Sequence, residues 1–430
     1  MSIYKQSSIK GLFILPGLML IFSMLVFPTS YQQIKIFLLI VVSLELLVWF
    51  FYQKAIPIKI ELVLFILFVN VVSGFFILLG AFRGEPGAFR VTTVYLLWPI
   101  VFLILFSSLV HKEIIIKLFK VFIYALMAIS LYSFMYIGHA LGVVPDALYI
   151  EFDLGQNIGF YDGFMEYALY SISSLIFLIP FCIAGLFVWD APFYKELKIS
   201  KKSLFIVTGL GVISAILSGR RALWLVIALS VFIVFLLHLI IEKKNQGRFI
   251  KKVVWGVVLF LVIVLCAFPI LSKEIDLNFL SLLNQFNFDA GPERNSQLEA
   301  LMNGWLNHPL FGNGHGAVAT VIRSEEMPWA YELQYADVLF KTGIVGFAVY
   351  SLSGIWVILK LISLAKKYPR AKMIIIPILT ALIAFLIANA TNPYLLKFDY
   401  IWILLFPIGV INYYLLKNNK IMCKEEANND

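Results

Sequence analysis

Long apolar runs dominate the chain, and its polar residues gather in the segments between them. The runs are long enough for helices of roughly 20 residues, the length that crosses the hydrocarbon core of a bilayer. The short alternating segments typical of membrane strands do not occur. The pattern predicts about twelve transmembrane helices, over residues 11–27, 34–52, 60–80, 91–110, 116–138, 166–189, 203–219, 222–241, 252–271, 336–360, 373–390 and 398–416.

The longest polar stretch between these runs is an outer loop over residues 272–335. Inside it, apolar residues recur at helical spacing, and a proline at position 309 ends the pattern. This spacing predicts a short amphipathic helix over 293–307. A second outer loop, over residues 139–164, is acidic and aromatic, as a sugar-binding loop or any solvated loop can be.

Composition agrees with this interpretation, because 61% of the 430 residues are hydrophobic and only 14% are charged. A soluble globular chain has roughly 45–50% apolar and about 25% charged residues. We therefore expect an all-α integral membrane protein, with residues 1–430 as one polytopic membrane domain and 417–430 as a cytoplasmic tail. The three cysteines form no CxxC pair, so we expect neither a disulfide nor a structural zinc.

The basic residues indicate how the chain is oriented. If the N-terminus is cytoplasmic, the tails and the even-numbered loops hold 24 of the 34 lysines and arginines. This excess follows the positive-inside rule and places both termini in the cytoplasm. The net charge of +9 is therefore explained without a nucleic-acid partner.

Arginines concentrate on the outer side. Only two of the 24 inner basic residues are arginine, whereas six of the ten outer ones are: Arg83, Arg90, Arg220, Arg221, Arg294 and Arg323. Arginine is the residue suited to bidentate recognition of phosphate or carboxylate. The distribution indicates an anionic ligand at the outer face; the alternative is interfacial snorkelling and salt bridges to outer glutamates.

Ionisable residues near membrane depth are costly and therefore functional candidates. Glu332, Tyr335 and Asp337 share one neighbourhood at the start of a predicted span. Glu332 is the first candidate base, and its alternative is a helix-start carboxylate paired with an arginine. His315, in a glycine-rich turn, is either a base or a hydrogen-bonding turn residue. No DxD pair occurs, so we expect no metal and no cofactor.

Three patches resemble the O-antigen polymerase and ligase superfamily of bacterial membrane glycosyltransferases. The first is Leu217-Ser-Gly-Arg-Arg-Ala-Leu-Trp224, in which either arginine matches the family arginine, with Arg221 slightly favoured. The second is Arg294 followed by Asn307-His-Pro-Leu-Phe-Gly-Asn-Gly-His-Gly316. The third runs from Glu332 to Gly346.

The third patch departs from the family pattern. Ligases show His-Asn, nine residues, Gly, two residues, Gly. Here Gly343 and Gly346 match, but Glu332 and Leu333 stand where His and Asn are expected. In ligases that histidine is the proposed base or the group that orients the acceptor. Its absence argues against a ligase and favours a polymerase, in which Glu332 would do the acid–base work.

The resemblance implies a GT-C-like arrangement and inverting, metal-independent transfer of glycan from an undecaprenyl diphosphate carrier at the outer leaflet. A diphosphate leaving group needs cationic stabilisation. The implied site comprises Glu332, His315 and Asp337 as catalytic candidates, and Arg220, Arg221, Arg294, Arg83, Arg90 and Tyr335 as substrate- or diphosphate-binding candidates.

The expected function is a polymerase of the inner membrane that joins lipid-linked repeat units into O-antigen or capsule. The alternatives are an O-antigen ligase that transfers glycan to lipid A–core, a transporter or flippase, and a scaffold without chemistry. The expected partners are an undecaprenyl-diphosphate-linked oligosaccharide and membrane lipids, with a chain-length regulator implied by the resemblance alone.

Overall fold

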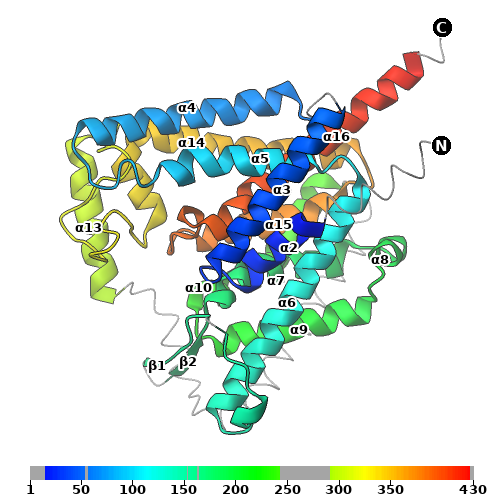
Figure 1. Ribbon diagram of the computed structural model, residues 1–430, viewed down its shortest axis with the longest axis horizontal. Coiled ribbons are helices and arrows are strands. Elements are labelled where there is room, and N and C mark those ends of the chain that lie inside the picture. Colours follow the sequence, from blue (N-terminus) through cyan, green and yellow to red (C-terminus); the bar gives the residue numbers. More distant parts are fainter. Residues whose placement is uncertain (1–14, 54–56, 153, 162–163, 243–290, 427–430) are drawn as a thin grey trace. The chain divides into compact units, whose positions relative to one another are not determined.

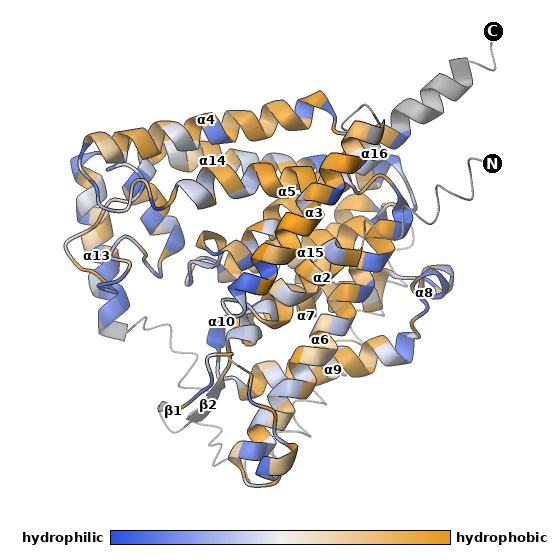
Figure 2. Cartoon of the chain, in the orientation of Figure 1, coloured by the Kyte–Doolittle hydropathy of each residue, from blue (hydrophilic) through white to orange (hydrophobic). Residues whose placement is uncertain are grey.

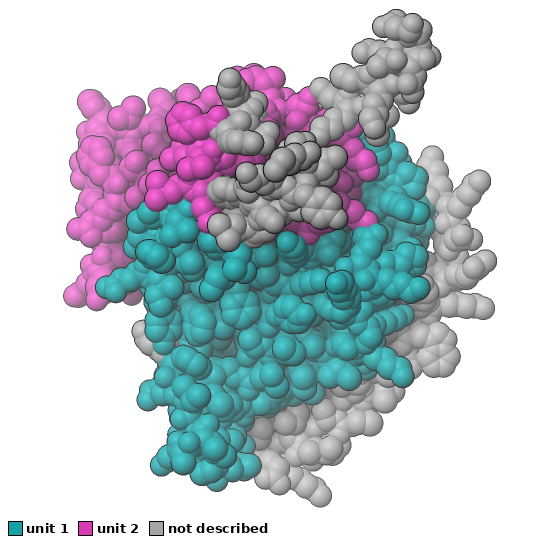
Figure 3. Space-filling view, turned by 45° about the vertical axis from the view of Figure 1, so that its right-hand side comes forward, with its two compact units in different colours: residues 1–41, 116–288, 365–388 teal, residues 42–115, 289–364, 389–430 magenta. Residues whose placement is uncertain are grey.

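A computed structural model describes residues 15–53, 57–152, 154–161, 164–242 and 291–426. The expected span 252–271, the first part of the large outer loop (272–290) and the last residues of the tail (427–430) lie outside these ranges. The chain forms two compact units, coloured separately in Figure 3. Unit 1 comprises 1–41, 116–288 and 365–388, and unit 2 comprises 42–115, 289–364 and 389–430.

The described chain is mostly helical (Figure 1). Its elements are α2 (Leu15–Val26), α3 (Gln32–Gln53), α4 (Ile60–Phe82), the π-helix η1 (Thr93–Leu97), α5 (Trp98–Ser107), α6 (Lys112–Ala140), η2 (Asp146–Leu148), β1 (Asn157–Tyr161), β2 (Phe164–Ala168), η3 (Tyr170–Ser174), α7 (Leu175–Val188), α8 (Ala191–Leu197), α9 (Lys201–Leu217), α10 (Arg221–Ile241), α13 (Gly291–Asn307), α14 (Gln334–Lys367), α15 (Lys372–Ala388), η4 (Tyr394–Leu396) and α16 (Phe398–Glu426).

The core of unit 1 consists of α7, α10 and α15, which pack against one another. Every residue of α7 from Leu175 to Gly185 is buried, as expected of a helix that is apolar on all sides. Helix α9 packs on the same core, because a side chain at Gly211 would meet Leu126 of α6 and Ile179 of α7. This unit also carries the antiparallel hairpin β1–β2, which begins in the loop expected over 139–164 and extends into the span expected over 166–189, where helix starts only at η3 and α7.

In unit 2, α4 packs against the neighbouring helix α14 (Figure 1). Phe65 and Trp356 stack with ring centroids 4.4 Å apart, and the Ser73 and Tyr350 hydroxyls are 2.9 Å apart. Helix α16 packs against α5. Apolar residues cover most of the surface of α4, whereas α13 mixes polar and apolar positions (Figure 2).

The helices agree with a membrane protein, but the expected count of twelve spans is not confirmed. Seven described helices are long and apolar enough to cross a membrane, or eight if the bent pair α8–α9 is one span. Three further apolar helices are shorter, at Leu15–Val26, Thr93–Ser107 and Lys372–Ala388. The helix expected over 293–307 is confirmed as α13.

Candidate functional site

Helix α14 is broken at Gly343, which adopts φ +60° and ψ −168°, a conformation essentially restricted to glycine. Such a break leaves backbone groups that need other hydrogen-bond partners. The segment Pro309–Gly316, here called the glycine loop, supplies them. Its carbonyls accept the N–H groups of Ile344 and Val345 at 2.9 and 3.1 Å, and one of its N–H groups donates to the Lys341 carbonyl at 2.7 Å.

The glycine loop also lies directly against the backbone of α4. The His315 N–H donates to the Phe76 carbonyl at 2.8 Å. A Cβ at Gly80 would come within 2.2 Å of the His315 carbonyl oxygen, and one at Gly314 within 2.3 Å of the Gly80 nitrogen. The two glycines therefore allow a backbone-to-backbone contact that no other residue permits.

The His315 side chain is fully enclosed. Its Nε2 lies 2.9 Å from the Tyr350 hydroxyl, which in turn is 2.9 Å from the Ser73 hydroxyl. Tyr95, from the π-helix, stacks on its ring at 3.9 Å. Burial, and secondarily the charge of Lys341, holds the His315 pKa well below its usual value. A neutral, enclosed ring fits the hydrogen-bonding role better than that of a base that meets substrate.

Asp337 forms a buried ion pair within its own helix. Its carboxylate lies 2.6 Å from Lys341 Nζ, and the two side chains are 0% and 2% exposed. Lys341 also donates to the Trp329 carbonyl at 2.7 Å and lies 5.7 Å from the centre of the Tyr331 ring. Removing one partner of such a pair leaves an uncompensated buried charge. The contacts of Asp337 therefore suit a structural role.

Glu332 lies between two arginines. Its Oε2 is 2.6 Å from Arg294 Nε, and its Oε1 is 2.9 Å from Arg323 Nη2. Arg294 comes from the first turn of α13, whereas Arg323 comes from the segment that follows the glycine loop. The Gln297 amide oxygen accepts the Glu332 N–H at 3.5 Å. This cluster, Arg294–Glu332–Arg323, joins a predicted base to a predicted phosphate ligand.

The other candidates of unit 2 surround the glycine loop and the chain that follows it. Arg83, at the end of α4, donates to the Gly312 carbonyl at 2.6 Å. The Arg90 guanidinium lies 5.5 Å from the centre of the Trp329 ring. Both arginines are exposed, as is Tyr335 at the start of α14. Exposure leaves all three accessible to a ligand from solvent.

Two side chains, partly buried Glu85 and fully buried Tyr331, hold the chain between the glycine loop and Glu332. The Glu85 carboxylate accepts the Val318 N–H at 3.2 Å, and the Tyr331 hydroxyl accepts the Ala319 N–H at 2.6 Å. Burial raises the pKa of Glu85, although that hydrogen bond and nearby cations lower it in part. Burial also raises the pKa of Tyr331 to about 12.

Arg220 and Arg221 belong to unit 1, at the start of α10. Arg220 donates to the Ser173 hydroxyl at 2.5 Å and to the Leu169 carbonyl at 3.3 Å, whereas Arg221 is exposed. Burial raises the pKa of nearby Glu166, and the two guanidinium groups oppose that shift. Arg220 is thus engaged in holding the turn before α7, and Arg221 is the more exposed of the two arginines.

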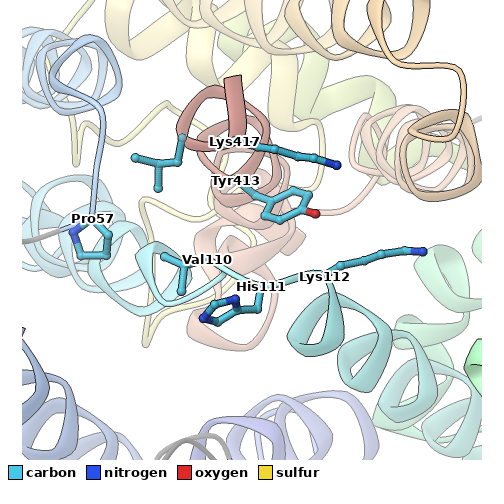
Figure 4. A pocket seen from close by; sticks show the side chains of 7 residues that line it. Pro57, Val110, His111, Lys112, Tyr413 and Lys417 are labelled. Atoms are coloured by element: carbon cyan, nitrogen blue, oxygen red, sulfur yellow. The ribbon is translucent and has the colours of Figure 1, made fainter. Parts of the chain in front are cut away.

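Two features lie apart from these residues. Within the described ranges, no three His, Cys, Asp or Glu side chains are grouped so that they share a metal ion. A cavity of about 320 Å³ in unit 2 contains none of the predicted site residues (Figure 4). Its lining comprises Pro57, Val110, His111, Lys112, Tyr413, Leu416 and Lys417.

The fold and these contacts define a helical, multi-span membrane protein with an arginine-rich charged cluster beside a broken helix. Residues 206–351 match the family model described as O-antigen ligase, which covers about a third of the chain. This match supports the resemblance to the O-antigen ligase/polymerase superfamily that the sequence motifs indicate. No curated protein matches the chain. The matched range contains Arg220, Arg221, Arg294, Arg323 and Glu332.

The sequence offers no assignment for two charged residues of these clusters. Arg323 is an outer arginine that lies outside the three resemblance patches, and Lys341 is an outer lysine that lies within the third patch but at none of its matching positions. Their partners, Glu332 and Asp337, are both predicted site residues. The i, i+4 spacing of Asp337 and Lys341 is a signal from which their ion pair is predictable. Nothing in the sequence links Arg323 to Arg294.

Proposed function

We propose that this chain is a membrane polysaccharide polymerase that joins lipid-diphosphate-linked oligosaccharide repeat units into a longer glycan. The observation that carries the proposal is the Arg294–Glu332–Arg323 cluster, because it combines phosphate-binding cations with a carboxylate. The superfamily match and the apolar helices support the membrane setting. The charge distribution supports cytoplasmic termini and a site that faces the outer side of the cell membrane.

The proposed reaction is an inverting displacement. The acceptor hydroxyl oxygen attacks the anomeric carbon of the donor, and its proton passes to the Glu332 carboxylate. The bond between that carbon and the phosphate oxygen breaks, and its electron pair leaves with the lipid diphosphate. Arg294 stabilises the charge that develops on this leaving group. The family arginine of unit 1, Arg221 or Arg220, is by the resemblance a separate candidate ligand for a lipid diphosphate. Exposed Arg83, Arg90 and Tyr335 contact the second lipid diphosphate or the sugars.

A ligase that transfers glycan to lipid A–core is the second candidate, since the matching family model is described as O-antigen ligase. The residue at position 332 favours the polymerase. Ligases have histidine followed by asparagine there, whereas this chain has Glu332 and Leu333. A carboxylate paired with two arginines is chemically unlike a neutral imidazole, because it carries a full charge that both cations bind.

The test is a glycan profile of cells that lack this chain, rescued with wild type, Glu332→Gln or Glu325→Gln. Glu325 is an exposed residue of the same segment and serves as the matched control. If the chain is a polymerase, cells that lack it show a glycan of one repeat unit instead of a ladder of chain lengths. Only wild type and Glu325→Gln then restore the ladder. Complete loss of glycan from lipid A–core indicates the ligase. A ladder that survives loss of the chain contradicts the polymerase proposal for that glycan.

A further inference from the structure

The two arginines at Glu332 converge on a single anionic group. Each binds a different carboxylate oxygen, Arg294 at 2.6 Å and Arg323 at 2.9 Å. The Arg294 and Arg323 side chains are 38% and 45% exposed, whereas that of Glu332 is only 17% exposed. The cations are therefore accessible from solvent, and the carboxylate lies more deeply between them.

Such a pair of guanidinium groups suits a phosphoryl group as well as a carboxylate. Both ligands present negatively charged oxygens that accept charge-assisted N–H bonds, and the planar fork of arginine matches either. A diphosphate has more acceptor oxygens and more charge than a carboxylate, so it competes effectively for the same two cations. Arg294 and Arg323 come from separate segments, which lets each rotate toward a larger ligand without changing the other.

We propose that Arg294 and Arg323 form the diphosphate site of the lipid-linked donor, and that Glu332 occupies this site until the donor displaces it. Arg323 is thereby a diphosphate ligand in its own right. The displaced carboxylate loses both ion pairs and becomes available to accept the proton of the acceptor hydroxyl. This inference rests on the proposed function, and it makes donor binding the event that releases the base.

The direct test is binding of inorganic pyrophosphate to the full-length protein in nanodiscs of zwitterionic lipid, measured by calorimetry. Glu332→Gln removes the competing charge, so we expect the Kd of this variant for pyrophosphate to be about fivefold lower than that of wild type, which corresponds to about 1 kcal/mol. Arg323→Gln removes one ligand, so we expect its Kd to rise by at least about fivefold. Glu325→Gln, the exposed control, keeps the wild-type Kd. Unchanged Kd values for Glu332→Gln and Arg323→Gln overturn the inference, as does wild-type protein that binds no pyrophosphate.

A conservative variant separates binding from folding. Arg323→Lys keeps the positive charge beside Glu332 and therefore supports the fold if Arg323→Gln is unstable. A purely structural role predicts that Arg323→Lys keeps both stability and wild-type pyrophosphate binding. The proposed site predicts a stable protein whose pyrophosphate affinity is at least about fivefold below that of wild type, because the planar fork is lost.

The outcome also distinguishes this inference from the proposed function. If the glycan ladder requires Glu332 but pyrophosphate affinity depends on neither Glu332 nor Arg323, the displacement is wrong and the polymerase stands. If the affinities change as expected but the ladder survives loss of the chain, the anion site stands and the polymerase is wrong.

Discussion

The contact between α4 and the glycine loop predicts a large effect of one methyl group. Gly80→Ala places a Cβ 2.2 Å from the His315 carbonyl oxygen, which is backbone and has no rotamer that relieves the clash. The loop must move by about 1 Å to reach an ordinary contact distance of more than 3 Å. That movement stretches the hydrogen bond from the His315 N–H to the Phe76 carbonyl, now 2.8 Å long.

The expected cost follows from three terms. Overpacking of a well-packed site costs about 1–3 kcal/mol. Loss of one buried hydrogen bond adds about 0.5–1.5 kcal/mol. Replacement of a helical glycine by alanine stabilises the helix by about 1 kcal/mol, which offsets part of this cost. We therefore expect Gly80→Ala to lower the free energy of unfolding by about 0.5–3.5 kcal/mol.

Gly74 provides the matched control in the same helix, because a Cβ there meets nothing within 4 Å. Gly74→Ala keeps or slightly raises stability. The free energy of unfolding of both variants is measured by reversible denaturation in mixed micelles, beside wild type. Equal stability of Gly80→Ala and Gly74→Ala would refute the reasoning, because it would mean that the loop does not lie against α4 at this position.

Three further predictions concern the site. Arg221→Lys keeps the charge but loses the fork, so polymer should fall roughly tenfold or more at normal membrane levels of the protein; near-normal polymer contradicts bidentate binding. Transfer activity should persist in EDTA, and a loss that Mg²⁺ or Mn²⁺ restores would count against cationic side chains as the only stabilising charge. Because burial lowers the His315 pKa, wild-type stability should fall as the pH drops below about 6.5, and thermal melting of His315→Gln should depend less on pH in that range.

Hydrophobic periodicity was sufficient to predict the class of fold and one element of the large loop. The spacing of apolar residues between Leu298 and Leu306 predicts a helix over 293–307, and α13 spans Gly291–Asn307. Length was harder to predict, because several apolar runs extend past the residues that adopt helical backbone. The run over 91–110, for example, forms a helix only over Thr93–Ser107, in which the π-helix η1 leads directly into α5.

Contacts between distant segments were not predictable from the sequence. Motif spacing singles out Arg294 and Glu332 individually. For Glu332 the sequence left two alternatives, a catalytic base or a carboxylate paired with an arginine. That Arg323 binds the same carboxylate depends on how the chain turns between the glycine loop and α14. The hairpin β1–β2 was also missed, because its strands of five residues show little alternation.

The hydrogen bonds between the glycine loop and the broken helix α14 form in a fixed order as the chain is synthesised. Helix α4 and the glycine loop both precede α14 in the chain, so both are synthesised before Gly343. The N–H groups that follow the break therefore emerge after the carbonyls that accept them. A nascent chain halted before α14 holds only the α4 side of this contact. Synthesis of α14 supplies the other side of the contact. The backbone groups of the glycine loop therefore stay unpaired only for the time that one helix takes to be made.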